Sequence, residues 1–352
     1  MLGSGSWGTT LATILGRDGG RSVTLWCRDV GRARAIAARR ENERYLPGVT
    51  IPNTVVVTAD LELALRSDAL IIAAPAQGVP ALQARIAPLL RPAHRLCSAT
   101  KGFTQDETPR RMSEVWADVM PAARTAVLSG PNISHEIAAG LPAPTVIASG
   151  DRDTARAFQD LLGTPMFRAY TNADVIGVEL CGALKNIVAL GAGAIDGMGY
   201  GVNAKAGFMT RGLVEIARYV FASGGDPLTC AGLAGFGDLI ATCTSARSRN
   251  RTVGELLAKG ASLADVRSRL GGQIAEGIGT TQAVHVLAAA LGVEMPIVTE
   301  TYRVLFEGKP VRDAMRGLME RERGEELSGP LADVSQLLRS TRVTRGDGRP
   351  PD

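Results

Sequence analysis

The chain has 352 residues and a formal net charge of +4, and 45% of its residues are hydrophobic. This length predicts two domains, and the composition excludes a disordered chain. The small charge and the lack of a basic run interleaved with aromatic residues exclude nucleic acid as a partner. No run approaches the roughly 18 apolar residues of a spanning helix, and no basic leader opens the chain, so we expect a cytoplasmic protein without an integral membrane segment.

The first 170 residues alternate between short β-branched runs and helical patterns, which indicates a parallel sheet with crossover helices. Strands are predicted at residues 23–26, 54–58, 69–74, 95–99, 125–129, 145–149 and 166–170. Helices are predicted between them at residues 9–17, 29–40, 79–90, 108–120 and 151–162. This alternation is typical of a doubly wound α/β domain.

The chain opens on a glycine-rich loop, Gly3-Ser4-Gly5-Ser6-Trp7-Gly8, which runs directly into a helical pattern. In a dinucleotide-binding fold the first glycine makes the turn, the second admits the pyrophosphate, and the third lets helix and strand pack. A flexible glycine-rich start is the alternative, but a strand follows at the distance expected of a βαβ unit. We therefore predict a Rossmann-type sheet whose cofactor contacts the loop. The predicted contacts are Gly3, Gly5, Ser6, Trp7 and Gly8.

The strand that should precede this loop is almost absent, because only Met1 and Leu2 come before Gly3. Either the start of the chain has been assigned several residues too late, or the domain is built with a stub in place of its first strand. The first explanation is favoured, since each large apolar residue lost from a central strand costs about 1.5–3 kcal/mol. A chain extended upstream is then expected to be more stable and to bind the cofactor better.

The residues after the second strand bear on the choice between NAD and NADP. An acidic residue at this position takes the ribose hydroxyls of NAD, whereas an arginine takes the 2′-phosphate of NADP. Here Arg28 favours NADP, and Asp29 is better explained as the cap of the next helix. The sequence leaves the preference between NAD and NADP open.

The second half has helical spacing with glycines threaded through it, and we predict an all-α C-terminal domain. Four glycines in one long pattern, Gly177, Gly182, Gly191 and Gly193, indicate either close helix packing or interruptions of the helix. The predicted organisation is a dinucleotide-binding domain over residues 1–172, a helical substrate domain over residues 173–323 and a disordered tail over residues 324–352.

Few residues in this chain suit acid–base or metal chemistry. Five cysteines form an odd set without a C-x-x-C motif or ligand-like spacing to the three histidines, which indicates a reduced compartment and no metal site. Only five of the 39 basic residues are lysines. Because an arginine cannot lose its proton near neutral pH, a general acid would have to be one of these lysines.

Several short segments spread along the chain together resemble those of one protein family. In chain order they are RYLPG at 44–48, ATKG at 99–102, LSGP at 128–131, GVEL at 177–180, GALKN at 182–186, GLAGFGDL at 232–239, TCTS at 242–245, SRNR at 248–251 and AEG at 275–277. With the glycine loop, they closely resemble the bacterial-type NAD(P)-dependent glycerol-3-phosphate dehydrogenases, from Gly3 to about Gly308. The resemblance implies reversible NAD(P)H-dependent reduction of dihydroxyacetone phosphate to sn-glycerol 3-phosphate, which supplies phospholipid synthesis, and a homodimer.

By this resemblance Lys185 is the catalytic proton carrier and also contacts the substrate. Its neighbours in the sequence are apolar, a setting that lowers the pKa of an ammonium group by desolvation. The alternative is a snorkelling lysine at the edge of a buried helix. Lys101 follows a strand at the ligand-binding edge of the sheet, and the resemblance implies contacts with both substrate and cofactor. If the two lysines are close, repulsion depresses their pKa values further.

The resemblance also implies a substrate-phosphate site around Arg249, which would reach the cofactor as well. An arginine fork suits a phosphate dianion, although a solvated loop is the alternative for such a segment alone. Asp238 would accept from substrate hydroxyls or orient Lys185, and as an isolated residue it would be a helix cap. The substrate contacts implied in these two segments and beside Lys185 are Asn186, Asp238, Ser248, Arg249 and Asn250.

Two further segments complete the implied site. The loop after the strand at 125–129 would contact substrate through Gly130 and Asn132 and cofactor through Ser134, although residues 132 and 134 depart from the usual family pattern. His135 lies in the same loop, but the family does not use it as a base. The remaining implied cofactor contacts are Tyr45, Ile274 and Glu276.

Two alternatives to this function remain open. A β-hydroxyacid dehydrogenase shares this architecture and a helix-borne lysine, but would reduce a carboxylated substrate. A catalytically silent dinucleotide sensor needs the glycine loop but no proton donor, so the presence of Lys101, Lys185, Asp238 and Arg249 together argues against it.

Overall fold

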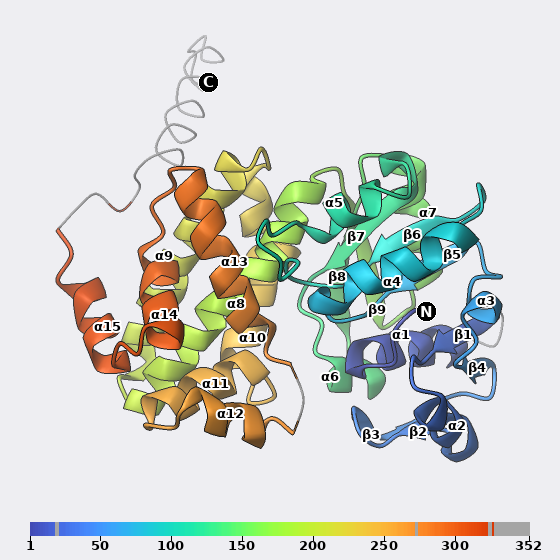
Figure 1. Ribbon diagram of the computed structural model, residues 1–352, viewed down its shortest axis with the longest axis horizontal. Coiled ribbons are helices and arrows are strands. Elements are labelled where there is room, and N and C mark those ends of the chain that lie inside the picture. The colour runs from blue at the N-terminus through green and yellow to red at the C-terminus, as the bar shows by residue number, and fades with distance from the viewer. Residues whose placement is uncertain (18–20, 272–273, 323–325, 327–352) are drawn as a thin grey trace, which may run out of the picture.

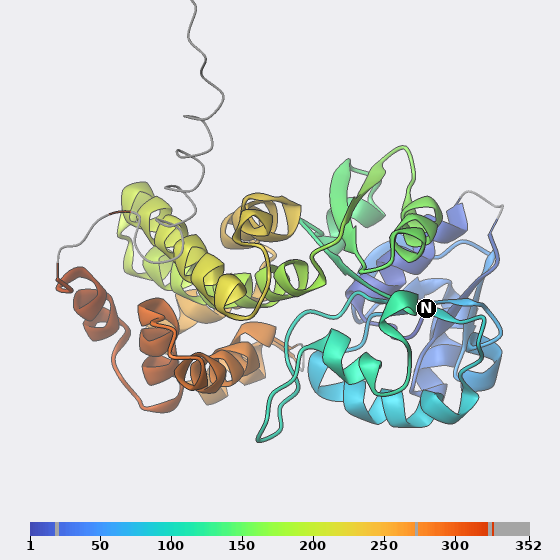
Figure 2. The same cartoon turned by 90° about the horizontal axis from the view of Figure 1, so that it is seen from above.

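Two regions of different architecture lie side by side in the computed structural model (Figure 1). The structure describes residues 1–17, 21–271, 274–322 and 326. Strands and helices alternate up to residue 172, whereas the described residues beyond it contain helices and no strand. Figure 2 shows the same separation from above. The predicted tail lies outside the described residues, apart from residue 326.

The first region is built on one twisted sheet. Its strands are β1 (Val23–Trp26), β4 (Val55–Thr58), β5 (Ala69–Ile72), β6 (Arg95–Ser98), β7 (Thr125–Ser129), β8 (Ala143–Ala148) and β9 (Phe167–Asn172). β1 pairs with β4, and β5, β6 and β7 pair in sequence order, all parallel. β8 pairs antiparallel with β7 and parallel with β9. All seven predicted strands are confirmed to within about two residues at each end, and one antiparallel pairing joins an otherwise parallel sheet.

Leu2 occupies the centre of this sheet. It forms parallel bridges to Trp26 of β1 and to Ile72 of β5, so a single residue joins the two groups of strands. Its N–H donates to the carbonyl of Ile71 and its carbonyl accepts from Ala73, each at 2.8 Å. The side chain is fully buried. The sheet is therefore continuous through a one-residue stub, and the glycine loop starts directly from it.

Short helices cover both faces of the sheet: α1 (Ser6–Arg17), α2 (Val30–Arg39), α3 (Leu61–Ala64), α4 (Val79–Ile86), α5 (Met112–Ala117), α6 (Ser134–Ala138) and α7 (Arg152–Leu162). Asp29 caps α2 by accepting from the N–H of Arg32 at 2.6 Å, as its sequence context suggested. The helix predicted from residue 108 begins only at Met112, because an antiparallel bridge from Phe103 to Arg111 holds the preceding residues in a loop. A small hairpin of β2 (Glu41–Asn42) and β3 (Leu46–Thr50) was not predicted.

The second region is a bundle around one long helix, α8 (Val175–Met198). Around it lie α9 (Gly201–Ala222), the short turns η4 (Pro227–Ala231) and η5 (Leu233–Gly237), α10 (Asp238–Thr244), α11 (Arg249–Ala258), α12 (Leu263–Arg269), α13 (Glu276–Ala290), α14 (Pro296–Phe306) and α15 (Val311–Met319). α8 is long and apolar enough to cross a membrane by length and composition, but 83% of its most apolar window is buried inside the protein. It is the core helix of the bundle.

The glycines of α8 mark close approaches, and the helix is not interrupted at them. A Cβ on Gly193 would lie 1.9 Å from the carbonyl oxygen of Arg251 in α11, and one on Gly191 would lie 2.1 Å from the ring of Phe208 in α9. A Cβ on Gly182 would lie 2.4 Å from the hydroxyl of Ser129 at the end of β7. Small residues thus let α8 approach both its bundle neighbours and the sheet.

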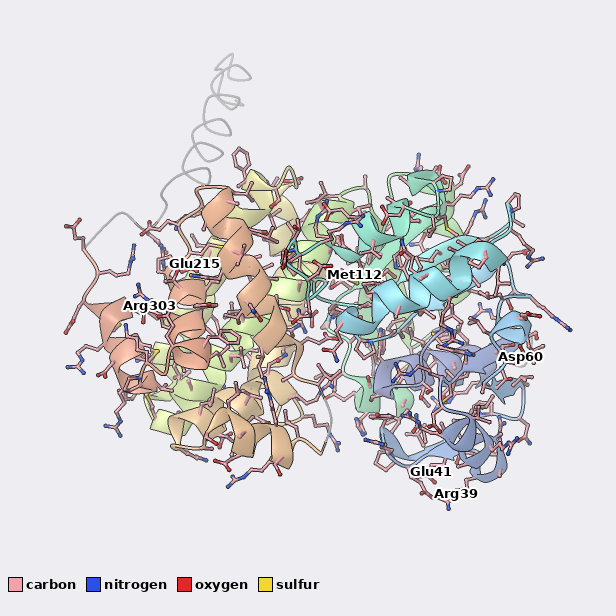
Figure 3. All side chains as sticks on the ribbon, in the orientation of Figure 1. Arg39, Glu41, Asp60, Met112, Glu215 and Arg303 are labelled. Atoms are coloured by element: carbon pink, nitrogen blue, oxygen red, sulfur yellow. The ribbon has the colours of Figure 1, made fainter. Side chains whose placement is uncertain are left out.

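A buried polar contact ties α8 to the sheet region. The carboxylate of Glu179 accepts from the N–H and hydroxyl of Ser113, at 2.7 and 2.6 Å, and pairs with Arg111 at 3.3 Å. Met112, between these two residues, is buried near the boundary of the two regions (Figure 3). This contact fixes the position of α8, which carries Lys185, relative to the sheet.

Candidate active site

The glycine loop has the geometry that its three glycines predict. Gly3 has φ +120°, and a Cβ there would lie 2.5 Å from the carbonyl oxygen of Ala73. A Cβ on Gly8 would lie 2.0 Å from the carbonyl oxygen of Gly3, so loop and helix touch. Around Gly5, in contrast, nothing lies within 4 Å of where a Cβ would be. The first and third glycines are thus required by the protein itself, and the second leaves open space beside the start of α1 that suits a dinucleotide pyrophosphate.

A buried amide that sequence reasoning missed holds this loop. Asn42 of β2 donates to the carbonyl of Ser4 at 2.9 Å and to the hydroxyl of Thr9 at 2.8 Å. Ser134 at the start of α6 is close by, since its carbonyl accepts from Thr10 at 3.2 Å. Trp7 packs edge-on against Phe167, with ring centroids 6.2 Å apart. Contacts from β2, α6 and β9 therefore hold the beginning of α1.

Basic residues gather beyond the end of β1. Arg28 is exposed there, and Asp29 is committed to capping α2. Two guanidinium groups lie near the Tyr45 ring, that of Arg32 at 5.6 Å and that of Arg44 at 5.3 Å from its centroid. Arg32 also donates to the Tyr45 hydroxyl at 3.3 Å. This is a positive, partly aromatic surface of the kind that accommodates an adenosine 2′-phosphate, and Arg32 and Arg44 had not been predicted.

Two lysines from different regions share one carboxylate. Lys185, on α8, donates to Oδ1 of Asp238 at 2.7 Å, and Lys101, after β6, donates to Oδ2 at 2.6 Å. Lys185 also donates to the hydroxyl of Thr242 at 2.5 Å, and Lys101 to the carbonyl of Gly130 at 3.2 Å. Asp238 is 2% exposed and Lys185 is 7% exposed. We call Lys101, Lys185, Asp238 and Thr242 the lysine cluster, of which only Thr242 had not been predicted as a site residue.

The environment of Lys185 tunes its acidity. Burial lowers the pKa of its ammonium group to about 8, and the positive charge of Lys101 acts in the same direction. Asp238 opposes both effects by stabilising the charged form. A group with this pKa can give up and take back a proton near neutral pH, which a solvated lysine cannot do.

Next to Lys185 in the sequence, Asn186 forms a hydrogen bond with a second predicted site residue, Asn250. Asn250 donates to the side-chain carbonyl of Asn186 at 2.9 Å and accepts from the N–H of Gly277 at 3.0 Å. Both asparagines are buried. A Cβ on Gly277 would lie 2.7 Å from the carbonyl oxygen of Asn186, so this glycine is needed for the close approach. The three residues join α8, α11 and α13.

Arg249 opens α11 next to this junction. Ser248 caps the helix by accepting from the backbone N–H three residues further on, at 3.3 Å. Arg249 is exposed, and its charge acts on the carboxyl of Glu276 together with those of Lys101 and Lys185. Burial raises the pKa of Glu276, and the three cations act against that rise. The predicted phosphate-binding arginine and both lysines of the cluster therefore act on one buried carboxyl group, that of Glu276.

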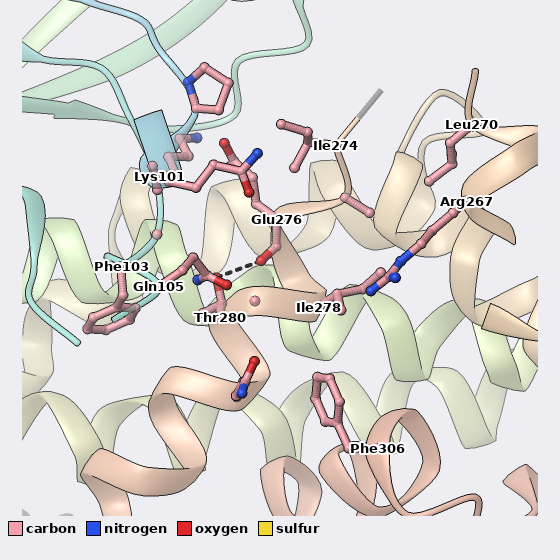
Figure 4. Close-up of a pocket in the computed structure, with 17 residues that line it drawn as sticks. Lys101, Phe103, Gln105, Arg267, Leu270, Ile274, Glu276, Ile278, Thr280 and Phe306 are labelled. Atoms are coloured by element: carbon pink, nitrogen blue, oxygen red, sulfur yellow. Dashed lines mark hydrogen bonds between the residues drawn. The ribbon is translucent and has the colours of Figure 1, made fainter. Parts of the chain in front are cut away.

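A pocket of about 320 Å³ opens beside Lys101 between the two regions (Figure 4). Glu276 is held at its edge at the start of α13, where its carbonyl accepts from the hydroxyl of Thr280 at 2.8 Å. Lys101, Ile274 and Glu276 had been predicted as cofactor contacts. Side chains that had not been predicted also line the pocket, among them Phe103, Gln105, Arg267 and Phe306.

Asn132 has a different environment from the other predicted residues. Its side-chain oxygen accepts from Thr145 at 3.0 Å and its amide donates to the carbonyl of Pro144 at 3.2 Å, so both ends are bonded to β8. Burial, together with the charge of Arg247, lowers the pKa of His135 in the same loop. Among the described residues no group of three or more histidine, cysteine or acidic side chains could hold a metal ion.

Comparisons with known proteins cover nearly the whole chain. Family models described as the N-terminus and the C-terminus of NAD-dependent glycerol-3-phosphate dehydrogenase match residues 1–155 and 174–316. A glycerol-3-phosphate dehydrogenase, NAD(P)+, of Moorella thermoacetica is 46% identical over 328 residues, covering 93% of this chain and 97% of the relative. One from a Parafrankia species is 47% identical over 329 residues, covering 93% and 98%.

Solved structures agree with these relatives. The glycerol-3-phosphate dehydrogenase of Coxiella burnetii superposes with a TM-score of 0.87 at 37% identity, covering 91% of this chain and 98% of that one. The enzyme of the same name from the yeast "Sacharomyces Cerevisiae" gives a TM-score of 0.75 at 27% identity, covering 91% and 98%.

Proposed function

This chain belongs to the NAD-dependent glycerol-3-phosphate dehydrogenase family, and we propose that the lysine cluster and Arg249 carry its reaction. The protein is an NAD(P)-dependent oxidoreductase. It reduces dihydroxyacetone phosphate reversibly to sn-glycerol 3-phosphate, which supplies glycerophospholipid synthesis. The observation that carries the residue assignment is the shared carboxylate of Asp238, which joins a buried lysine of low pKa to a lysine at the ligand-binding edge of the sheet.

The cofactor contributes the hydride that reduces the substrate carbonyl carbon. The residues present fit it at three places: the open space at Gly5, the positive surface around Tyr45 and the pocket lined by Ile274 and Glu276. The N–H groups at the start of α1 would hold its pyrophosphate. Arg28 favours the 2′-phosphate of NADP at the other end.

Lys185 is the proton carrier. In the reduction its ammonium group protonates the oxygen that develops negative charge as the carbonyl is reduced. In the reverse direction the neutral amine takes the proton back. Because its pKa is about 8, both forms are populated near neutral pH. Lys101 adds positive charge beside the same oxygen.

Asp238 and Thr242 hold the amine of Lys185 in position. Each accepts one of its three N–H groups, which leaves the third for the substrate oxygen. The carboxylate also raises the pKa of Lys185, which counters the lowering by burial and by the charge of Lys101. Asp238 is thus a positioning residue that keeps Lys185 charged enough to act as an acid.

Arg249 binds the substrate phosphate. Its guanidinium provides a planar fork, and a charge-assisted pair with a phosphate is worth about 1.5–3 kcal/mol. The hydrogen bond between Asn186, next to Lys185, and Asn250, next to Arg249, ties the start of α11 to α8. Ser248 and Gly130 contribute backbone and hydroxyl groups around the same small ligand.

We assign residues 1–172 to the dinucleotide-binding domain and residues 173–323 to the substrate domain. Support comes from the change of architecture between β9, which ends at Asn172, and α8, which begins at Val175. We further propose that the protein is a cytoplasmic homodimer. Sedimentation velocity tests the oligomeric state directly.

The experiment mixes purified protein with dihydroxyacetone phosphate and either NADH or NADPH, and follows the nicotinamide absorbance. We expect oxidation of the cofactor with this substrate and none with a β-keto acid of similar size. Turnover of the keto acid alone would identify a β-hydroxyacid dehydrogenase, and cofactor binding without turnover of either compound would identify a sensor.

A further inference from the structure

Cys181 and Cys230 lie in contact, although 49 residues separate them in the sequence. The sulfur of Cys181, on α8, is 3.4 Å from the sulfur of Cys230, in η4. Both side chains are buried, at 0% and 3% exposure. No other pair of cysteine sulfurs is in contact among the described residues. We propose that these two thiols are a redox modification site that closes to an intramolecular disulfide and thereby switches off the lysine cluster.

Hydrogen bonds already hold α8 and η4, the two elements that carry the cysteines, against each other. Asp174, the cap of α8, accepts from the N–H of Gly177 at 2.8 Å, from the N–H of Asp226 at 3.0 Å and from the hydroxyl of Thr229 at 2.7 Å. This carboxylate therefore holds the start of α8 against η4. To form the bond, the sulfurs must approach from 3.4 Å to about 2 Å, a movement within reach of side-chain rotation and a small shift of η4.

Each of the two cysteines lies close to an element that carries one member of the lysine cluster. Cys181 lies four residues before Lys185, one helical turn away on the same face of α8. Cys230 packs directly under Gly235, where a Cβ would lie 2.1 Å from the carbonyl oxygen of Cys230. Asp238 follows three residues later, at the start of α10. A bond that draws η4 towards α8 would thus move Asp238 relative to Lys185.

The oxidant is a hydroperoxide, and the step balances with hydrogen peroxide. The Cys230 thiol gives up its proton, and the thiolate attacks one oxygen of the peroxide to form a sulfenic acid; the hydroxide that leaves takes the released proton and becomes water. The Cys181 thiol then attacks that sulfur, forms the S–S bond and releases a second water. Two thiols lose two electrons and two protons, and the peroxide accepts them. A dithiol reductant reverses the modification by exchange.

Access to the pair is through η4. This turn has only five residues and carries Leu228, which is 60% exposed, and it follows a glycine pair at 224 and 225. To expose the pair, the turn must open locally and break its hydrogen bonds to Asp174, which costs less free energy than unfolding the whole domain. The hydrogen bond to Cys230, followed by burial, raises the pKa of Cys181, so the closed form reacts slowly. Oxidation is therefore expected under sustained oxidant rather than at once.

The test is peptide mapping of the reduced, full-length protein after treatment with hydrogen peroxide, without reductant. We expect a linked peptide containing residues 181 and 230, and a fall in kcat of about 10-fold or more that dithiothreitol restores. Cys181→Ala and Cys230→Ala are expected to keep their turnover under the same treatment. Cys97→Ala, which alters a buried cysteine of β6 that contacts no other sulfur, is the matched control and should respond like the parent protein.

Two results would overturn the proposal. One is complete consumption of these thiols without a 181–230 linkage in the parent protein, a measurement that does not depend on any variant folding. The other is an equal loss of turnover in the parent protein and in Cys230→Ala. The loss of turnover rests on the proposed function, whereas the linkage does not. A linked peptide in a protein that never reduces dihydroxyacetone phosphate would therefore contradict the function and leave the modification site in place.

Discussion

The glycine loop and the lysine cluster are both functional, but they are assembled in different ways. The loop is local in the sequence: six consecutive residues contain the turn, the packing contact and the open space, and Ala73 and Asn42 support them from outside. The lysine cluster is built from three elements, with Lys101 after β6, Lys185 on α8 and Asp238 on α10. Up to 137 residues separate the partners of one of its hydrogen bonds.

This difference affects how each site responds to substitution. In the loop, a change alters backbone geometry at one place, and the strain depends on which glycine is replaced. In the lysine cluster, a change alters the charge felt by the other members, because all lie in a desolvated environment where charges interact strongly. Substitutions should therefore act on cofactor affinity in the first case and on turnover and pH dependence in the second.

The largest effect is expected for Lys185→Met. The change removes the proton carrier but keeps a side chain of similar length in the buried helix, so turnover should fall by at least about 10²-fold. Steady-state kinetics with dihydroxyacetone phosphate measure this. Lys205→Met, which alters a lysine that pairs with Asp196 and makes no hydrogen bond to the cluster, is the control and should retain turnover. Turnover near the parent level would remove Lys185 from the mechanism.

Asp238→Asn should change the pH profile. In the parent protein, reduction requires charged Lys185, so kcat should fall as pH rises through about 8. The carboxylate raises the pKa of Lys185, and its removal should move this fall to lower pH by about one pH unit or more. A profile of kcat between pH 6 and pH 10 would test this. An unchanged midpoint with lower kcat would indicate that Asp238 acts only through geometry.

Two substitutions in the glycine loop should separate stability from cofactor binding. Gly8→Ala places a Cβ against the Gly3 carbonyl and should destabilise the protein by about 1–3 kcal/mol. Gly5→Ala meets no protein atom and should leave the melting temperature unchanged, while weakening NADPH binding about 10-fold if the pyrophosphate occupies that space. Thermal unfolding and cofactor titration of both variants give the comparison. Equal cofactor affinity in Gly5→Ala and the parent would place the pyrophosphate elsewhere.

The smallest effect is expected outside both sites. Glu215, inside the helical region (Figure 3), is buried and accepts from the N–H of Ile297 at 2.8 Å. Burial raises its pKa to about 7, above that of an unfolded glutamate. A raised carboxyl pKa gives stability that is present at low pH and lost as pH rises through about 7.

In Glu215→Gln this side chain stays neutral at every pH. Between pH 5 and pH 8 the free energy of unfolding should therefore fall less in the variant than in the parent, by about 1–3 kcal/mol. Turnover should not change. Denaturant unfolding at several pH values measures this difference. Parallel stability curves for the two proteins would show that the carboxyl titrates normally.

Much of the fold could be predicted because its signals are local. The β-branched runs identified every strand of the main sheet, and the cap at Asp29 follows from a side chain that reaches only three residues. The hairpin of β2 and β3 was missed, because β2 has only two residues and β3, with the sequence LPGVT, contains a proline and a glycine that are typical of turns. Asn42 was missed with it, since nothing in its neighbours indicates that its amide would bond to the loop 38 residues earlier.

The sequence by itself determined the α/β architecture, the glycine loop and, through its motifs, the family. Its lysines could be singled out as candidate acids because only five are present. Only the tertiary structure decided that two of them share Asp238, that Thr242 joins them and that Cys181 meets Cys230. The reason is physical: hydrogen-bonding patterns and hydrophobic periodicity act over a few residues, whereas the pKa of a buried amine depends on whichever charges the fold brings within a few ångströms.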